Sequence, residues 1–200
     1  MGKKYIMALD QGTTSSRCIL FDHEGNICGM AQKELTQIYP QPGWVEHDPK
    51  EILAQIKEAA EEVMEKAHVT AEQVECMGID NQGETVVVWD KVTGEPLYPA
   101  IVWQDRRTAT WIEELEEDIR YMIRQKTGLH ADAYFGATKI KWILDNVEGA
   151  KEAAMEGRLL AGPTDSWFIW NLTERKVFAT DYSTASRTAL FNIHTNEWDH

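Results

Sequence analysis

The residues best suited to chemistry lie in a short polar segment near the start of the chain, between two apolar runs. In order they are Asp10, Gln11, Gly12, Thr13, Thr14, Ser15, Ser16 and Arg17. A phosphate-binding turn needs a glycine where the backbone approaches the anion, amide and hydroxyl donors, and a carboxylate that holds Mg²⁺ through its water shell. This segment supplies all of these, and Arg17 adds a fixed positive charge. The same composition is equally typical of an ordinary hairpin turn, so both interpretations stay open.

Three further polar clusters could form one side of a binding site. Residues 81–84 read Asn-Gln-Gly-Glu, and a carboxylate beside amides can hold polyol hydroxyls, which both donate and accept. Residues 103–107 read Trp-Gln-Asp-Arg-Arg, in which the indole suits a wall for a polyol's carbon backbone. Tyr134 and Phe135 suit a second wall. Each cluster also has a simpler interpretation: a polar loop, a helix N-terminus whose dipole favours Asp105, or a pair of core aromatics.

The two commonest nucleotide-binding motifs do not occur in this sequence. It contains neither G-x-x-x-x-G-K-[ST] nor G-x-G-x-x-G. A P-loop enzyme or a Rossmann dehydrogenase is therefore poorly supported.

The spacing of apolar residues predicts the elements that position these clusters. The expected strands are Tyr5–Leu9, Cys18–Phe21, Asn26–Leu35, Val74–Ile79 (a buried strand), Thr85–Trp89, Ala100–Trp103 and Arg158–Ala161. The expected helices are Asp48 to about His68, a mostly helical stretch from Arg107, Phe135–Val147 and Pro163–Asn171. The first two strands form a hairpin around the polar turn. The pattern predicts one mixed α/β domain, antiparallel at its start and flanked by helices.

The helix that begins near residue 48 has clear terminal signals. Asp48 suits the N-cap, Pro49 the first helical position, and Glu51 the third position of a capping box. One face of the helix is expected to be buried: Ile52, Ile56, Ala59, Val63 and Ala67.

Composition excludes several classes of function. The chain is 43% hydrophobic and 26% charged, as expected of a globular protein. Its net charge of -13 argues against nucleic acid and anionic membrane as partners, because both need clustered Lys and Arg. The sequence gives no interface signature, so a homo-oligomer stays open.

The cysteines and the N-terminal apolar run indicate a cytoplasmic location. Cys18, Cys28 and Cys76 share no metal or disulfide spacing, which fits a reducing compartment, and Cys18 and Cys76 are expected to be buried. The run Tyr5–Leu9 stops at Asp10 and is too short for a signal-peptide core.

Taken together and in order, these segments resemble the FGGY family of carbohydrate kinases, which includes the glycerol kinases. The resemblance is carried by residues 8–17, 37–40, 42–49, 103–108, 138–139, 141–145, 164–167, 185–188 and 190–194. It spans nearly the whole chain. It implies two actin-like, ribonuclease-H-like domains with ATP and polyol between them, residues 1–200 being part of the N-terminal domain, without the second, adenine-binding domain.

The resemblance also implies roles for particular residues. Thr13, Thr14, Ser15 and Arg17 would contact the phosphates of ATP, and Asp10 would lie near Mg²⁺. The glycerol site would be lined by Gly83, Glu84, Trp103 and Tyr134. The catalytic base would lie beyond His200, so that no residue of this chain is expected to be the base.

Two departures from the family pattern leave alternatives open. The family loop reads Asn-Gln-Arg-Glu, and Gly83 stands where that arginine holds glycerol; Thr184 stands where asparagine is usual. The resemblance implies ATP-dependent phosphorylation of glycerol to glycerol 3-phosphate, with residues 1–200 inactive alone. The alternatives are a ligand-binding pseudokinase fragment and a kinase for another polyol or ketose. An actin-like or chaperone-like ATPase is disfavoured by the specific runs after Tyr39.

Overall fold

The computed structural model describes residues 4–199, which divide into two compact units. The first comprises the chain up to Gln37 and His47–Gln82. The second comprises Ile38–Glu46 and the chain from Gly83 onward. None of the helices in the described part of the chain is long and apolar enough to cross a membrane.

The first unit is built on a mixed four-stranded sheet in the order β3-β2-β1-β5. Its strands are β1 (Tyr5–Gln11), β2 (Ser15–Phe21), β3 (Ile27–Glu34) and β5 (Val74–Asp80). β1 and β2 form the predicted antiparallel hairpin, β3 continues it, and β5 pairs with β1 in parallel. The predicted mixed sheet that begins with a hairpin is therefore confirmed.

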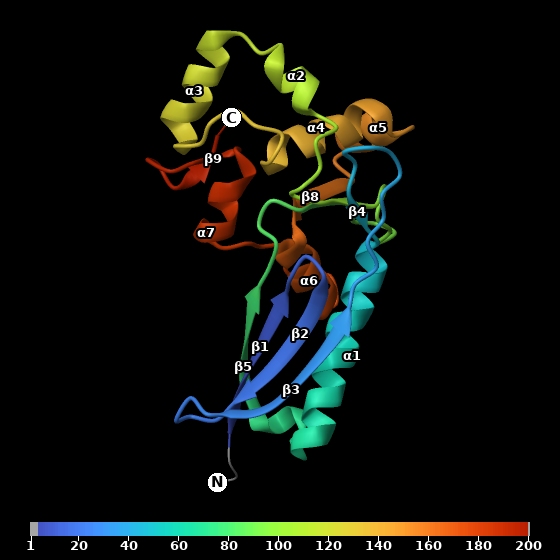
Figure 1. The fold of residues 1–200 in the computed structure, drawn as a ribbon, viewed down its shortest axis with the longest axis vertical. Helices are drawn as coiled ribbons and strands as arrows, with labels where there is room; N and C mark the ends of the chain where they lie inside the picture. The colour runs from blue at the N-terminus through green and yellow to red at the C-terminus, as the bar shows by residue number, and fades with distance from the viewer. Residues whose placement is uncertain (1–3, 200) are drawn as a thin grey trace. The chain divides into compact units, whose positions relative to one another are not determined.

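Helix α1 (Pro49–Ala67) lies along one face of this sheet, as Figure 1 shows, and packs mainly on β2 and β3. Asp48 caps it by accepting a hydrogen bond from Lys50 N at 2.8 Å. Glu51 does not complete the capping box; its carboxylate accepts from Thr36 N and Gln55 Nε2. Four of the predicted face residues are buried, namely Ile52, Ile56, Ala59 and Val63. Ala67 is only half-buried, and Pro49 is buried in addition. A short 3₁₀ turn, η1 (Ala71–Gln73), leads into β5.

The prediction that β5 is buried is wrong. All of its residues are exposed or half-buried, and Cys76 is exposed, whereas Cys18 on β2 is buried as predicted. The physical reason is position: β5 is an edge strand, and α1 covers β2 and β3 instead. The apolar run 74–79 thus predicted the strand correctly but did not predict that the strand would be left exposed or half-buried.

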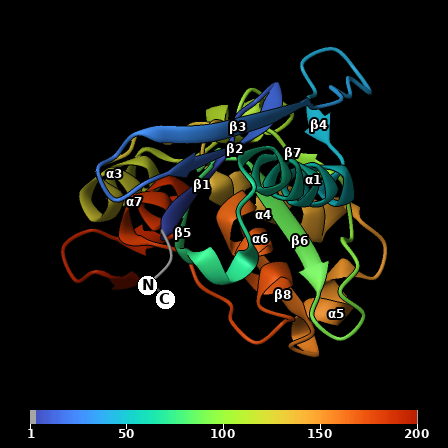
Figure 2. The ribbon, with the colours of Figure 1, turned by 90° about the horizontal axis from the view of Figure 1, so that it is seen from below.

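The second unit contains a sheet in the order β4-β7-β6-β8. Its strands are β4 (Glu46–His47, at the boundary of the units), β7 (Ala100–Ile101), β6 (Val86–Asp90) and β8 (Leu159–Pro163). Figure 2 shows β6 and β8 side by side, paired antiparallel, with α6 beside β8. Every residue of β6 is buried, and Trp89 packs edge-on against Trp167 with ring centroids 5.2 Å apart. This strand forms the centre of the unit's core.

The remaining elements of the second unit surround that sheet. The helices are α2 (Ala109–Glu113), α3 (Glu117–Thr127), α4 (Gly136–Asn146), α5 (Ala150–Met155), α6 (Thr164–Leu172) and α7 (Tyr182–Ala185), followed by the 3₁₀ turn η2 (Ser186–Thr188). A small hairpin of β9 (Phe191–Asn192) and β10 (Glu197–Trp198) follows. α4 and α6 both contact β6 and β8. The long helices and strands predicted from periodicity are present, with ends shifted by a few residues.

Candidate active site

The predicted phosphate turn is the tip of the β1–β2 hairpin in the first unit. Gly12 N donates to Ser15 O at 2.9 Å and closes the turn. A Cβ on Gly12 would lie 3.3 Å from the Ser15 carbonyl oxygen, so a side chain there would crowd the turn. Thr14 is exposed, while Thr13 and Ser15 are half-buried. The tip therefore presents hydroxyl groups at the end of a rigid hairpin.

The carbonyl groups of the turn are held by neighbouring side chains and backbone. Gln11 Nε2 donates to Gly12 O at 2.7 Å, and Gln82 Nε2 donates to the same oxygen at 3.1 Å. Gln37 Nε2 donates to Thr13 O at 2.8 Å. Leu35 N donates to Thr14 O at 2.9 Å. Because these bonds fix the peptide planes, the shape of the turn is determined before any ligand binds.

A buried histidine supports this arrangement. The His47 Nε2 atom lies 3.0 Å from Gln37 Oε1, and the His47 side chain is fully buried. Burial lowers the pKa of His47 to about 4, so the ring is neutral at physiological pH. A neutral ring that donates through Nε2 orients the Gln37 amide toward the Thr13 carbonyl.

The predicted metal residue, Asp10, ends β1 beside the turn. Its carboxylate lies 3.5 Å from an Arg17 Nη1 atom, and both side chains are 38% exposed. The parallel register places Asp80, the last residue of β5, beside Asp10. Mg²⁺ prefers oxygen ligands and keeps most of its waters when one or two carboxylates and substrate phosphates hold it. The donor set fits such an ion; Asp80 was not among the predicted residues, and only the strand register reveals it.

The predicted acceptor residues gather in the second unit around Glu84. Arg187 Nε donates to Glu84 Oε1 at 2.6 Å, and the Glu84 side chain is 12% exposed. The Arg187 guanidinium lies over the Phe135 ring at 5.0 Å and the Tyr134 ring at 6.0 Å. The Tyr134 ring in turn meets Trp103 edge-on, with centroids 5.7 Å apart.

The pKa of Tyr134 is shifted by its neighbours in this cluster. Burial raises the pKa of Tyr134, the Glu84 carboxylate raises it further, and the Arg187 guanidinium acts in the opposite direction. The phenol group of Tyr134 therefore lies close to both charges. The result is a carboxylate and a guanidinium beside two aromatic walls.

Gly83 borders the same cluster. A Cβ built on Gly83 would lie 3.3 Å from Arg187 Cγ and 3.7 Å from Thr184 Cγ2. The space left by the missing side chain is therefore bounded by Arg187 and Thr184, the second position that departs from the family pattern. The structure thus brings together all four predicted acceptor residues, namely Gly83, Glu84, Trp103 and Tyr134.

A buried lysine fixes the loop that carries Tyr134. Lys139 Nζ donates to the carbonyl oxygens of Ala133, Tyr134 and Phe135, and the lysine is 1% exposed. Burial lowers the pKa of Lys139 to about 7, while the carboxylates led by Asp105 act against that shift. One side-chain nitrogen thus bonds three successive carbonyl groups and fixes the backbone that carries the Tyr134 ring.

The segment that follows Trp103 is anchored by a buried ion-pair network. Arg107 Nη2 lies 2.7 Å from Glu46 Oε1 and 2.8 Å from Asp105 Oδ2, and its side chain is 0% exposed. The guanidinium stacks 3.8 Å from the Trp44 ring centroid and 4.6 Å from that of Trp142. Asp105 also accepts from Val45 N at 2.7 Å. The polar cluster 103–107 is therefore mainly a structural anchor for Trp103.

Sequence reasoning missed Arg187 and Lys139 as parts of this site. Residues 185–188 carried part of the family resemblance, but nothing in their spacing indicated that Arg187 reaches Glu84, 103 positions away. Lys139 sits in an amphipathic helix, α4, where its contacts with backbone carbonyls leave no pattern in the sequence.

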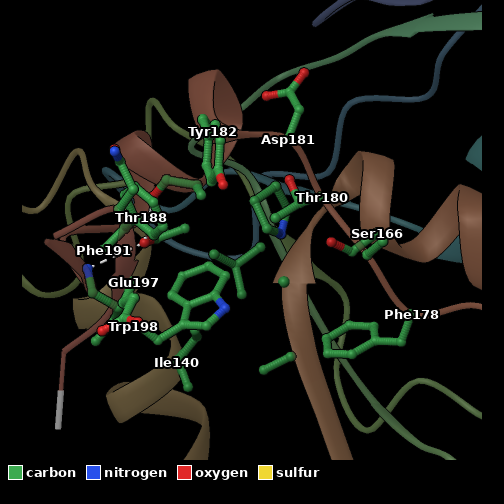
Figure 3. A pocket seen from close by; sticks show the side chains of 18 residues that line it. Ile140, Ser166, Phe178, Thr180, Asp181, Tyr182, Thr188, Phe191, Glu197 and Trp198 are labelled. Atoms are coloured by element: carbon green, nitrogen blue, oxygen red, sulfur yellow. Dashed lines mark hydrogen bonds between the residues drawn. The ribbon is translucent and has the colours of Figure 1, made fainter. Parts of the chain in front are cut away.

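A separate cavity of about 630 Å³ lies elsewhere in the second unit. Figure 3 shows the Phe178 ring and the Trp198 indole on opposite sides of it, with Tyr182 and Phe191 nearby. None of the four predicted acceptor residues lines this cavity. The polar chemistry predicted for a polyol is therefore in the Glu84 cluster.

Curated relatives match this chain over almost its whole length. The glycerol kinase of Francisella philomiragia is 59% identical over 201 residues, which cover 100% of this chain and 40% of the relative. The glycerol kinase of Clostridium beijerinckii is 60% identical over 199 residues, which cover 98% of this chain and 40% of the relative. The chain thus spans about 40% of the length of these curated relatives.

Solved structures agree with the fold. The crystal structure of Plasmodium falciparum glycerol kinase with ADP has a TM-score of 0.91 at 36% identity, covering 99% of this chain and 40% of that one. The gluconate kinase of Lactobacillus acidophilus has a TM-score of 0.84 at 22% identity, covering 99% of this chain and 38% of that one, and shows the fold alone.

These likenesses identify the class of protein first: a mixed α/β chain with the actin-like ATPase fold of sugar kinases, as predicted. The N-terminal domain of the FGGY family of carbohydrate kinases matches residues 5–200. The chain belongs to the FGGY family of carbohydrate kinases.

Proposed function

We propose that this chain is part of a kinase that transfers the γ-phosphoryl group of ATP to a terminal hydroxyl of glycerol, forming glycerol 3-phosphate. The observation that carries the proposal is the Glu84 cluster, in which a carboxylate, a guanidinium and two aromatic rings meet. The identity of 59–60% to curated glycerol kinases supports glycerol as the acceptor.

The cluster suits a small polyol for chemical reasons. Each hydroxyl of a polyol both donates and accepts, so it needs an acceptor such as Glu84 and a donor beside it. The carbon backbone is apolar and packs against the faces or edges of rings such as Trp103 and Tyr134. Because Glu84 already pairs with Arg187, it is suited to holding a hydroxyl rather than to removing its proton. We therefore keep the proposal that the base lies outside residues 1–200.

The hairpin of the first unit would hold the nucleotide phosphates. Thr13, Thr14 and Ser15 supply hydroxyls at the tip, and Arg17 supplies a positive charge. Asp10 would hold Mg²⁺ through water, and the ion would neutralise phosphate charge during transfer. In phosphoryl transfer the protein contributes mainly positioning and charge stabilisation, which is the kind of help these residues can give.

The alternatives receive less support. A kinase for another polyol or ketose was suggested by Gly83, but Arg187 and Thr184 border the space beside that glycine. A pseudokinase fragment would keep the cluster and lose turnover, so it is separated from the main proposal by an assay and not by the fold.

The test is a coupled ADP-release assay with Mg²⁺, ATP and glycerol, on a protein of the relatives' full length that carries this chain and on residues 1–200 alone. We expect glycerol-dependent turnover by the longer protein only, because a missing base alone costs about 10²- to 10⁴-fold. Asp10→Ala should nearly abolish that turnover. Glycerol binding without turnover in the longer protein would favour the pseudokinase; glycerol-dependent turnover by residues 1–200 would show that the base is among them.

A further inference from the structure

In the Glu84 cluster, Arg187 pairs with Glu84 and lies beside the rings of Tyr134 and Phe135. It lies in η2, far along the chain from the other members, and its side chain is 38% exposed. Its Nε atom is engaged with Glu84 Oε1 at 2.6 Å. A guanidinium has five N–H donors in a fixed plane, so the two Nη groups carry four more beyond that bond.

Two aromatic rings and Gly83 lie beside the Arg187 side chain. The guanidinium carbon lies 5.0 Å from the Phe135 centroid and 6.0 Å from that of Tyr134. On another side, its Cγ would be 3.3 Å from a Cβ on Gly83, so glycine at 83 leaves room for the Arg187 stem. A long side chain that is stacked, ion-paired and still more than a third exposed is ordered and open to a ligand at the same time.

We infer that Arg187 is an acceptor-binding residue. Its Nη groups donate to one hydroxyl of the polyol, and the neighbouring hydroxyl of the polyol donates to Glu84. This inference rests on the proposed function and adds the donor that the Glu84 cluster requires. A carboxylate and a guanidinium side by side offer an acceptor and a donor next to each other, which matches two adjacent hydroxyls of a small polyol. The planar fork, and not the charge alone, provides that match.

A purely structural role for Arg187 makes a different prediction. If the arginine only braced Glu84, its loss would weaken folding slightly and leave the Michaelis constants for glycerol and ATP unchanged or shifted together. If it donates to the acceptor, the loss appears in the constant for glycerol alone. A hydrogen bond to a charged group corresponds to about a ten- to a hundredfold change in binding.

The experiment compares wild-type protein of the relatives' full length with Arg187→Met, Arg187→Lys and Arg158→Met. Arg187→Met keeps most of the stem that packs at Gly83 and removes the donors. Arg158 is a matched control because it is also a partly exposed arginine, 44% exposed, paired with a buried carboxylate, Asp90. The Michaelis constants for glycerol and for ATP are measured separately, and the midpoints of urea denaturation report the stability of the fold.

Arg187→Met is expected to raise the Michaelis constant for glycerol about ten- to a hundredfold, while the Michaelis constant for ATP stays within about twofold. Arg187→Lys should recover only part of the loss, and Arg158→Met should change neither constant. An unchanged constant for glycerol in Arg187→Met, or equal shifts in both constants, would overturn the inference. If Arg187→Met does not fold, Arg187→Lys decides the question. A Michaelis constant for glycerol equal to that of the wild type would overturn the inference, and a raised one would support it. Wild-type protein without turnover would overturn the proposed function instead.

Discussion

Replacing Arg107 with methionine should destabilise the second unit by about 3–5 kcal/mol, the usual loss when one partner of a buried ion pair is removed. The Arg107 side chain is 0% exposed and pairs with two carboxylates, Glu46 and Asp105, which are themselves 4% and 1% exposed. Without the guanidinium, both acidic groups would be buried with no cation in contact.

Two retained hydrogen bonds reduce the expected loss. Asp105 would keep its hydrogen bond from Val45 N, and Glu46 would keep its bond from the Tyr98 hydroxyl. Loss of the stacking of Arg107 on Trp44 increases the destabilisation, since a desolvated cation–π contact contributes about 2 kcal/mol. Methionine fills much of the vacated volume, so a cavity adds little.

The assay is urea denaturation followed by tryptophan fluorescence, with Arg106→Met as the control. Arg106 is the preceding residue, and it pairs with Asp132 at 2.7 Å, but its side chain is 52% exposed. An exposed ion pair contributes at most about 1 kcal/mol, so the control should lose less than that. Equal losses in the two variants would refute the reasoning, because the larger loss expected for Arg107 depends on the burial of its ion pairs.

Acid should destabilise the first unit through His47. Between pH 6.5 and about 4 the unfolded chain binds a proton that the folded chain does not, so the free energy of unfolding falls by up to about 1.4 kcal/mol per pH unit. His47→Gln should flatten that slope in urea titrations. Lys139 acts in alkali: between about pH 7 and 10.5 the unfolded chain again binds more protons, so stability rises with pH. Lys139→Met should remove that rise, and Lys141→Met, which changes an exposed lysine of the same helix, should not. Asp48→Ala should cost about 1 kcal/mol because its carboxylate caps α1; an unchanged urea midpoint would contradict that role.

Local chemistry made part of this fold predictable. Asp48 and Pro49 mark the start of α1 because an N-cap acceptor and a fixed φ act within a few residues. The first hairpin was equally readable, because two short apolar runs flank a turn. These signals depend only on neighbours in the sequence.

The features that sequence could not predict depend on distant neighbours. The exposure of β5 follows from where α1 lies, and no pattern inside Val74–Asp80 records that. The bond from Arg187 to Glu84 joins residues 103 positions apart. The carbonyl contacts of Lys139 involve backbone atoms, which every residue carries, and therefore leave no signal in residue types. Residue types suggested the candidate clusters and the family resemblance assigned them to the acceptor, whereas the ion pairs that orient them required the structure.

Phosphorus-31 NMR of a full-length protein that carries this chain, incubated with Mg²⁺, ATP and glycerol, measures directly whether the γ-phosphoryl group reaches a terminal hydroxyl. The expected result is a growing phosphate-monoester signal of glycerol 3-phosphate, matched by ADP, that is absent without glycerol and nearly absent in Asp10→Ala. Formation of ADP with inorganic phosphate as the only other product, at the same rate with and without glycerol, would contradict the proposed kinase activity.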